Sequence, residues 1–156
     1  MGVYRISRNI EASLVDFITA ELTTDSWTGI GVLKGFPQDY KGKAPFIGVE
    51  VLSLDPVKLE IGSKTHIKNY NVKIRIFATN DGQRLDLADW LFDELENDIT
   101  YYAYTITSGV VSAKVATGKI VIGSWNNNEK ELQNTADLEK EDKYRHLLSF
   151  DVTVAI

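Results

Sequence analysis

The sequence contains no cysteine among its 156 residues, which excludes disulfide bonds, thiolate metal sites and a cysteine nucleophile. Histidine is almost as scarce. His66 and His146 stand far apart, and neither has the HExxH or HxH neighbourhood of a zinc site. A metal would have to draw its other ligands from carboxylates that no pattern specifies, so we expect neither a metal nor a cofactor.

Long apolar runs are also missing, and no stretch reaches the length that spans a bilayer. The first residues carry Glu11 and Asp16, where a signal peptide would be apolar. Gly2 follows Met1, but Ile6 stands where the myristoylation pattern needs a small hydroxyl residue. These features predict a chain that stays in the cytoplasm, or is assembled there into something larger, without a membrane partner.

Basic residues are outnumbered: 17 Lys and Arg stand against 22 Asp and Glu, for a net charge of -5. This balance argues against broad phosphate binding, which needs basic side chains concentrated on one face. It remains compatible with passive contact with DNA. A hydrophobic content of 44% in 156 residues suits one domain, residues 1–156, with a core that needs no covalent staples.

The clearest positive feature is an alternating segment that leads through a short turn into an amphipathic helix, residues 69–95. Successive strand side chains point to opposite faces, so alternate residues are expected to be buried: Tyr70, Val72, Ile74, Ile76 and Ala78. Asp81 is the expected helix cap. The following helix places one apolar stripe toward the core: Leu87, Ala88, Leu91, Phe92 and Leu95.

The rest of the first half predicts a helix over residues 7–23, capped by Ser7 or Asn9. A short strand in GIGVLKGF follows, then an exposed loop and a strand over residues 46–54. Asp55-Pro56 is expected to turn the chain. Gly62-Ser63-Lys64 is typical of a hairpin tip, so residues 46–79 predict an antiparallel sheet with a projecting β-arm.

In the second half, residues 99–107 are rich in Tyr and Thr and favour extended chain. Residues 110–115 and 119–125 predict a second hairpin, with Thr117-Gly118 at its turn. The polar segment 126–143 is interpreted as a loop with partial helix. The last strand, residues 148–156, alternates and is expected inside the sheet. The fold class is therefore α+β, with two helices packed on one face of a mainly antiparallel sheet and a projecting β-hairpin arm.

Motifs for catalysis or nucleotide binding are weak. Gly29, Gly31 and Gly35 lack the Gly-Lys-Ser/Thr ending of a P-loop, so turns or close packing explain them better. Gly62-Ser63-Lys64-Thr65 holds similar letters in the wrong order and is interpreted as a turn. No nucleophile-elbow pattern is present. The sequence predicts no catalytic residues.

Charge concentrates on the second helix: residues 81–98 hold seven acidic side chains and one basic one. Asp86, Asp89 and Asp93 are spaced to share a face. Paired carboxylates serve glycoside hydrolysis, but that chemistry needs opposed groups across a cleft, which one helix face does not supply. Two interpretations stay open: a solvated face, or an acidic surface in an assembly, such as a channel wall that DNA slides past.

Aromatic residues leave a further alternative. The three tryptophans are expected in the core or partly buried: Trp27, Trp90 and Trp125. Tyr101, Tyr102 and Tyr104 could form an exposed ledge for stacking bases, but such a surface normally accompanies a basic groove, and only Lys114 and Lys119 are near in sequence.

The order of elements, with NVKIRIFATNDGQRLDLADWLFDELEN in the middle and HLLSFDVTVAI at the end, resembles the tail-terminator and tail-completion (neck) proteins of tailed bacteriophages. The resemblance covers most of the chain in layout, and its specific part is residues 69–97 plus the last strand. The long charged segment 126–143 departs from the family pattern. It leaves open whether the protein caps the tube, belongs to the neck or contacts a sheath.

The resemblance implies a structural ring protein rather than an enzyme, usually a homo-hexamer. Such a ring caps the head-proximal end of the tail tube and joins it to the head connector. The implied partners are other copies of the chain, the tail-tube protein, the head connector or a head-completion protein, and DNA passing through the lumen without specific binding. The implied location is the virion tail or neck, after assembly in the host cytoplasm.

Within this framework, Asp86, Asp89 and Asp93 are expected at the lumen or at a subunit interface. Assembly contacts are expected in the arm and in the polar segment, at Lys58, Gly62, Lys64, Glu131 and Glu139. Two alternatives remain: another phage neck, head-completion or minor tail protein, and an unrelated small-molecule-binding domain or enzyme.

Overall fold

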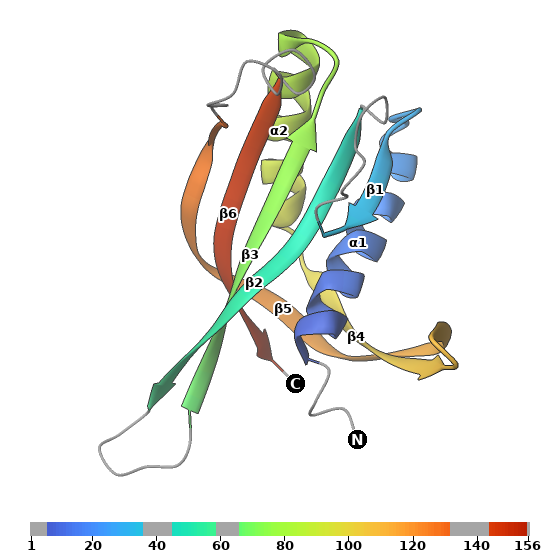
Figure 1. Ribbon diagram of the computed structural model, residues 1–156, viewed down its shortest axis with the longest axis vertical. Coiled ribbons are helices and arrows are strands. Elements are labelled where there is room, and N and C mark those ends of the chain that lie inside the picture. The colour runs from blue at the N-terminus through green and yellow to red at the C-terminus, as the bar shows by residue number, and fades with distance from the viewer. Residues whose placement is uncertain (1–5, 36–44, 59–65, 132–143, 156) are drawn as a thin grey trace.

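The computed structural model describes residues 6–35, 45–58, 66–131 and 144–155, which form two helices and six strands. Its sheet is mixed and curls into a half-barrel, with strand order β1-β2-β3-β6-β5-β4 (Figure 1). Only the β1–β2 pair is parallel. This arrangement confirms the α+β class. The elements are α1 (Ile6–Thr24), β1 (Gly31–Lys34), β2 (Phe46–Lys58), β3 (His66–Phe77), α2 (Asp81–Leu95), β4 (Ile99–Thr107), β5 (Val110–Lys130) and β6 (Arg145–Ala155).

Both helices bury their apolar stripes in one core on the concave side of the sheet. Alternate residues of β3 point into this core, and each pairs with an equally buried residue of β6. Six residues expected to be buried are all at most 2% exposed, which confirms the strand register: Ile74, Ile76, Leu91, Leu95, Phe150 and Val152. Among the described residues, no helix combines the length and apolar character needed to cross a membrane.

The curl brings the β4 edge of the sheet to one side of α1 and the β1–β2 edge to the other, so α1 contacts all three strands. Two polar side chains of α1 accept hydrogen bonds from the backbone of β4. The backbone N–H of Tyr102 donates to Ser13 Oγ at 3.0 Å, and that of Tyr104 donates to Asn9 Oδ1 at 3.4 Å. Asn9 Nδ2 also donates to the hydroxyl of Tyr101 at 3.1 Å. The helix therefore closes an edge that would otherwise expose unpaired donors.

Asn9 was expected as a possible helix cap, and so was Ser7, but both lie within α1. Asn9 is 2% exposed and faces β4. On the opposite side of the helix, Glu11 Oε2 accepts from the backbone N–H of Val51 at 3.5 Å, where β2 has a bulge. Contacts with the strands, rather than capping, explain Asn9 and Glu11.

The expected cap of α2 is also wrong, because the N-cap residue is Asn80 and not Asp81. Asn80 has an extended backbone, with φ -153°, and its side-chain oxygen accepts from the N–H of Gln83 at 2.8 Å. Gln83 Oε1 accepts in return from the N–H of Thr79 at 2.8 Å, which completes a reciprocal pair. Asp81 instead accepts from Arg84 Nε at 3.0 Å.

The expected turn at Asp55-Pro56 is wrong. β2 continues through both residues to Lys58, and Pro56 pairs with Lys68 of β3. Proline is tolerated there because β1 pairs only with residues 46–49 of β2. In the described part of the chain, the outer side of Pro56 therefore has no neighbouring strand to receive an N–H. The expected hairpin tip, Gly62-Ser63-Lys64, lies outside the described residues.

The hairpin expected within residues 110–125 is also wrong, because β5 is one strand of 21 residues. The turn lies earlier, at Ser108 and Gly109, whose φ values of 50° and 80° are those of a two-residue type I′ turn. Thr117, expected at a turn, is the extra residue of a bulge opposite Tyr101 and Tyr102.

The polar segment 126–143 begins as strand rather than as the expected loop. Residues 126–130 belong to β5, where Asn128 pairs with Leu148 and Lys130 with His146. Pairing with β6 outweighs the low strand propensity of this Asn-rich sequence. Residues 132–143 lie outside the described part. As expected, the last strand is internal, since β6 lies between β3 and β5.

Replacing Ile76 with Asp should lower the free energy of unfolding by several kcal/mol, because Ile76 is 0% exposed and a carboxylate there has no compensating partner. Urea unfolding followed by circular dichroism measures the change. Val121→Asp is the matched control, since Val121 lies in the same sheet but is 46% exposed. Equal stability of the two variants would contradict the core described above.

Replacing Asn9 with Leu should cost about 1–3 kcal/mol, because the N–H of Tyr104 and the hydroxyl of Tyr101 lose their partner in a buried place. The same unfolding assay applies. Thr23→Ala on the exposed side of α1 serves as control and should change stability by at most about 0.5 kcal/mol. An Asn9→Leu variant as stable as the control would show that α1 does not need this polar contact.

Candidate functional site

The acidic face of α2 is the first candidate surface. Asp86, Asp89 and Asp93 are all exposed and lie on the side of the helix opposite the buried Leu87 and Leu91. Their spacing of three and four residues places them in one row, as the sequence predicted. Among the described residues, none of the three has an ion-pair partner. The row is an uncompensated negative surface; whether it faces a lumen or a neighbour remains a prediction.

A second acidic group joins the carboxyl ends of the two helices. Glu21, Asp25 and Glu94 each bring a carboxylate oxygen within 4.8 Å of the others. Trp90 Nε1 donates to Asp25 Oδ2 at 2.7 Å, and its ring lies 5.9 Å from that of Trp27. The sequence did not predict this cluster, because no local pattern links α1 to a residue some 70 positions later.

Partial burial, together with the neighbouring carboxylates of Asp25 and Glu21, raises the pKa of Glu94 to about 7. A proton shared among these groups relieves the repulsion between them. Carboxylate oxygens are also ligands of hard cations such as Ca²⁺. Three oxygens at the protein surface do not by themselves define a metal site, since exposed acidic groups often gather without an ion.

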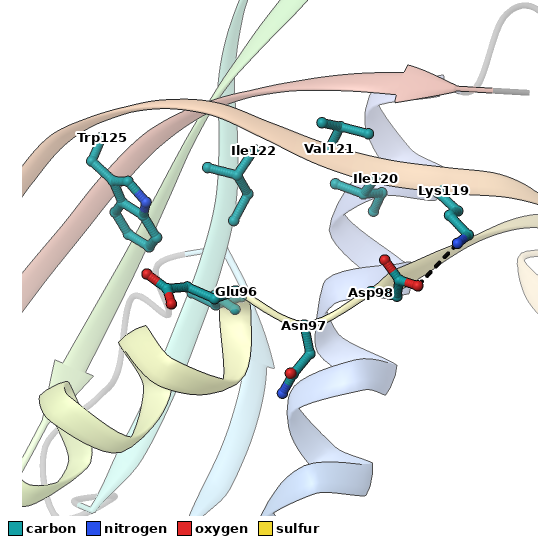
Figure 2. A pocket seen from close by; sticks show the side chains of 9 residues that line it. Glu96, Asn97, Asp98, Lys119, Ile120, Val121, Ile122 and Trp125 are labelled. Atoms are coloured by element: carbon teal, nitrogen blue, oxygen red, sulfur yellow. Dashed lines mark hydrogen bonds and ion pairs between the residues drawn. The ribbon is translucent and has the colours of Figure 1, made fainter.

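A hollow with a volume of about 450 Å³ lies between the end of α2 and β5 (Figure 2). Its apolar wall is formed by Ile120, Ile122 and Trp125. The rim is polar, with Glu96 and with Asp98, which pairs with Lys119 Nζ at 3.0 Å. The lining residues offer apolar contact beside acidic groups, and they do not place a nucleophile next to a base.

The tyrosines of β4, considered above as an alternative stacking ledge, do not form an exposed stacking surface. Tyr101 is buried, and Tyr102 and Tyr104 are half-buried. The hydroxyl of Tyr104 donates to Asp16 Oδ2 at 2.6 Å, and burial with this carboxylate raises the pKa of Tyr104. Lys114 Nζ lies 3.3 Å from the same carboxylate. These side chains hold β4 and β5 to α1.

His146 is a structural residue in the described part of the chain. Arg84 Nη1 lies 2.7 Å from His146 Nδ1, and His146 Nε2 lies 2.8 Å from Asn128 Oδ1. Because a guanidinium only donates, Nδ1 accepts and Nε2 carries the proton that Asn128 accepts. Burial and the charge of Arg84 lower the pKa of His146. The neutral ring thus ties the start of α2 to β5 and β6. The side chain of His66 is outside the described part.

Of the expected assembly residues, Glu131 is the one whose side chain the structure describes. Its Oε2 lies 3.2 Å from Arg75 Nε and 3.3 Å from Arg145 Nε, so it is held within its own chain. Lys58 ends β2, but its side chain lies outside the described part. The other three, Gly62, Lys64 and Glu139, lie in segments that the structure does not describe.

A surface that the sequence analysis missed is the β4–β5 ribbon, defined here as residues 105–118. Val110 and Val115 on this ribbon are 67% and 61% exposed, the highest values among the large apolar residues described. The sequence did not indicate this surface, because the turn expected at Thr117-Gly118 divided β5 into two short strands. The dipeptide Ser108-Gly109 was the available signal for the true turn.

No protein-family model matches the chain, and no curated protein sequence matches it either.

The carboxylate cluster predicts a dependence of stability on pH. The folded-state pKa of Glu94 is raised to about 7 from 4.5, so its stabilising effect is complete below pH 4.5 and is lost as the pH rises toward 7. Thermal unfolding from pH 4.5 to 8 should show this loss, and Glu94→Gln should reduce it and be more stable than the unmodified protein at pH 8. Glu96→Gln, at an exposed neighbouring position, is the control. Identical profiles for both variants would contradict the coupling within the cluster.

Proposed function

We propose that the chain is a structural ring protein of a bacteriophage tail, which caps the head-proximal end of the tail tube and joins it to the head connector. The layout that carries the resemblance supports this proposal: a helix, a strand pair, a strand leading directly into the acidic helix, and an internal last strand. The fold adds a curled sheet whose concave side is filled by both helices. Its work would be done by geometry and not by turnover.

The observation that carries the proposal is the acidic row Asp86, Asp89 and Asp93, which is fully outside the core and unpaired within the described residues. Packing and stability do not require such a row. In a ring, it would line or border the passage and repel DNA phosphates, so that DNA moves through without binding. Salt screens this repulsion beyond about 10 Å, so the row must lie close to the DNA path.

The arm is the second element of the proposal. β2 and β3 remain paired as far as Lys58 opposite His66, beyond the end of β1 and of the β3–β6 pairing. We propose that this pair continues as a projecting hairpin that reaches a neighbouring subunit or the tail tube. Lys58, Gly62 and Lys64 would lie in the arm, and Glu139 in a second contact segment. The assembled protein would belong to the virion tail or neck.

A closed ring requires each copy to present one surface to the next copy around a rotation axis, usually sixfold in this family. Such a ring has two different flat faces, one for the tail tube and one for the head connector. The same geometry fits another neck or head-completion protein. A tail-end ring and another neck protein differ in the partner that they bind, and binding to the tail-tube protein distinguishes them.

Charge reversal of the row, Asp86→Lys with Asp89→Lys and Asp93→Lys, should leave the monomer folded, because all three side chains are exposed. It should slow DNA passage in a particle assembly assay or disturb ring closure, as measured by light scattering and electron microscopy. The neutral variant Asp86→Asn, Asp89→Asn, Asp93→Asn is the matched control, since it keeps the shape and removes only the charge.

Addition of the unmodified protein to polymerising tail-tube protein should limit tube length. Normal ring closure and DNA passage in the Lys variant would leave the row as a solvated face. Tubes of unrestricted length, with rescue of head completion instead, would assign the protein to the neck rather than to the tube end.

A further inference from the structure

The β4–β5 ribbon extends beyond the β5–β6 pairing; among the described residues its two strands pair with no third strand, and Lys114 pairs with Asp16 of α1. β6 pairs with β5 no further than Ala155 opposite Lys119, so Val110–Gly118 has no strand on its β6 side among the described residues. Figure 1 shows the ribbon projecting past the lower end of α1. An isolated two-stranded ribbon is marginally stable in water, and a free edge without Pro pairs readily with another chain. The ribbon is therefore an incomplete surface.

One side of the ribbon continues the core-facing side of β4. Val110, Ala113 and Val115 pair with alternate residues of β4, on the same side as Ile99 and Tyr101. Ile99 and Tyr101 are 1% and 3% exposed, whereas Val110 and Val115 are 67% and 61% exposed. The apolar side of β4 and β5 is thus buried near Ile99 and Tyr101 and becomes exposed within the ribbon.

A second apolar surface lies where β2 leaves the core. Leu52 is the extra residue of the β2 bulge, and Leu54 pairs with Tyr70 two positions later. These leucines are 45% and 41% exposed. In Figure 1, the end of β2 points to the lower left and the ribbon points to the lower right. A head-to-tail contact between copies requires two different surfaces, and these two lie on different elements that diverge from each other.

Charge disfavours a contact in which two copies meet through their helices, and it does not oppose contact between the two apolar surfaces. Residues 81–98 carry seven acids against one base, and α1 adds Glu11, Asp16 and Glu21 against Arg8. Two copies that meet through their helices would repel one another. The ribbon has one charged residue, Lys114, which is paired with Asp16 of its own chain. Described strand residues 52–58 and 66–71 carry one acid, Asp55, and two lysines.

We infer that the apolar side of the β4–β5 ribbon packs over Leu52 and Leu54 of the next copy of the chain. This inference rests on the proposed ring and names the contact that closes it. The ribbon has 14 residues, fewer than the roughly 20–30 per side of a standard interface. Each contact is therefore weak alone, and closure of the ring, in which every copy uses both surfaces, makes the assembly stable.

The first test replaces Val110 and Val115 together with Glu and measures mass by light scattering. The unmodified protein should have the mass of a ring, and the variant should have the mass of one chain with an unchanged circular dichroism spectrum. Leu85→Glu is the control, because Leu85 is 47% exposed but lies on α2. Unimpaired assembly of the valine variant, or equal loss in the control, would overturn the inference.

The second test uses the absence of cysteine from the chain, so that any disulfide reports only introduced residues. Val110→Cys or Val115→Cys in one preparation is mixed with Leu52→Cys or Leu54→Cys in another and oxidised. At least one of the four mixtures should yield a cross-linked dimer, and the corresponding double variant should yield a ladder of larger species. Homodimers from the valine variants alone, or no cross-link in any mixture, would overturn the head-to-tail contact.

The outcomes separate the two proposals. If rings still form after the valine substitutions, the inferred contact is wrong and the proposed function is unaffected. If the cross-links form through the ribbon but the protein neither closes into rings nor caps tail tubes, the contact is correct and the proposed function is wrong.

Discussion

The two open edges of the curled sheet are the constraint on which this fold depends. A half-barrel brings both edges toward one gap, and each edge carries backbone donors that must be satisfied. α1 fills that gap, and its polar side chains reach both sides: Asn9 and Ser13 toward β4, and Glu11 toward β2. This one helix thereby supplies acceptors for three backbone N–H groups at the two edges, those of Val51, Tyr102 and Tyr104.

Periodicity predicted the parts of the fold in which local pattern and burial agree. The alternation of β3 and β6 indicated the correct inward residues, Ile74 and Phe150 among them, because a strand with one buried face has only one acceptable register. The apolar stripe of α2 was equally clear. The same helical spacing placed Asp86, Asp89 and Asp93 in one row. Periodicity says nothing of what that row faces, because the partner is not in the sequence pattern.

Features that depend on neighbours distant in sequence could not be predicted. Pro56 is a turn signal locally, yet β2 accepts it because β1 ends too early to require its missing N–H. Asn128 has low strand propensity, yet β6 pairs with it. The carboxylate cluster exists only because the ends of α1 and α2 meet in space. In each case the tertiary neighbour outweighs the local preference, and a single sequence does not reveal that neighbour.

The length of β5 has a mechanical consequence. One strand of 21 residues, about 70 Å if fully extended, runs from the ribbon past Asn128, whose side chain contacts His146 of β6; His146 in turn contacts Arg84 of α2. A pull on the ribbon along this strand loads the β5–β6 hydrogen bonds in shear, since those bonds lie perpendicular to the strands. They share the load together instead of opening one after another. A force on the ribbon is therefore resisted by the whole β5–β6 pairing before it reaches the acidic helix.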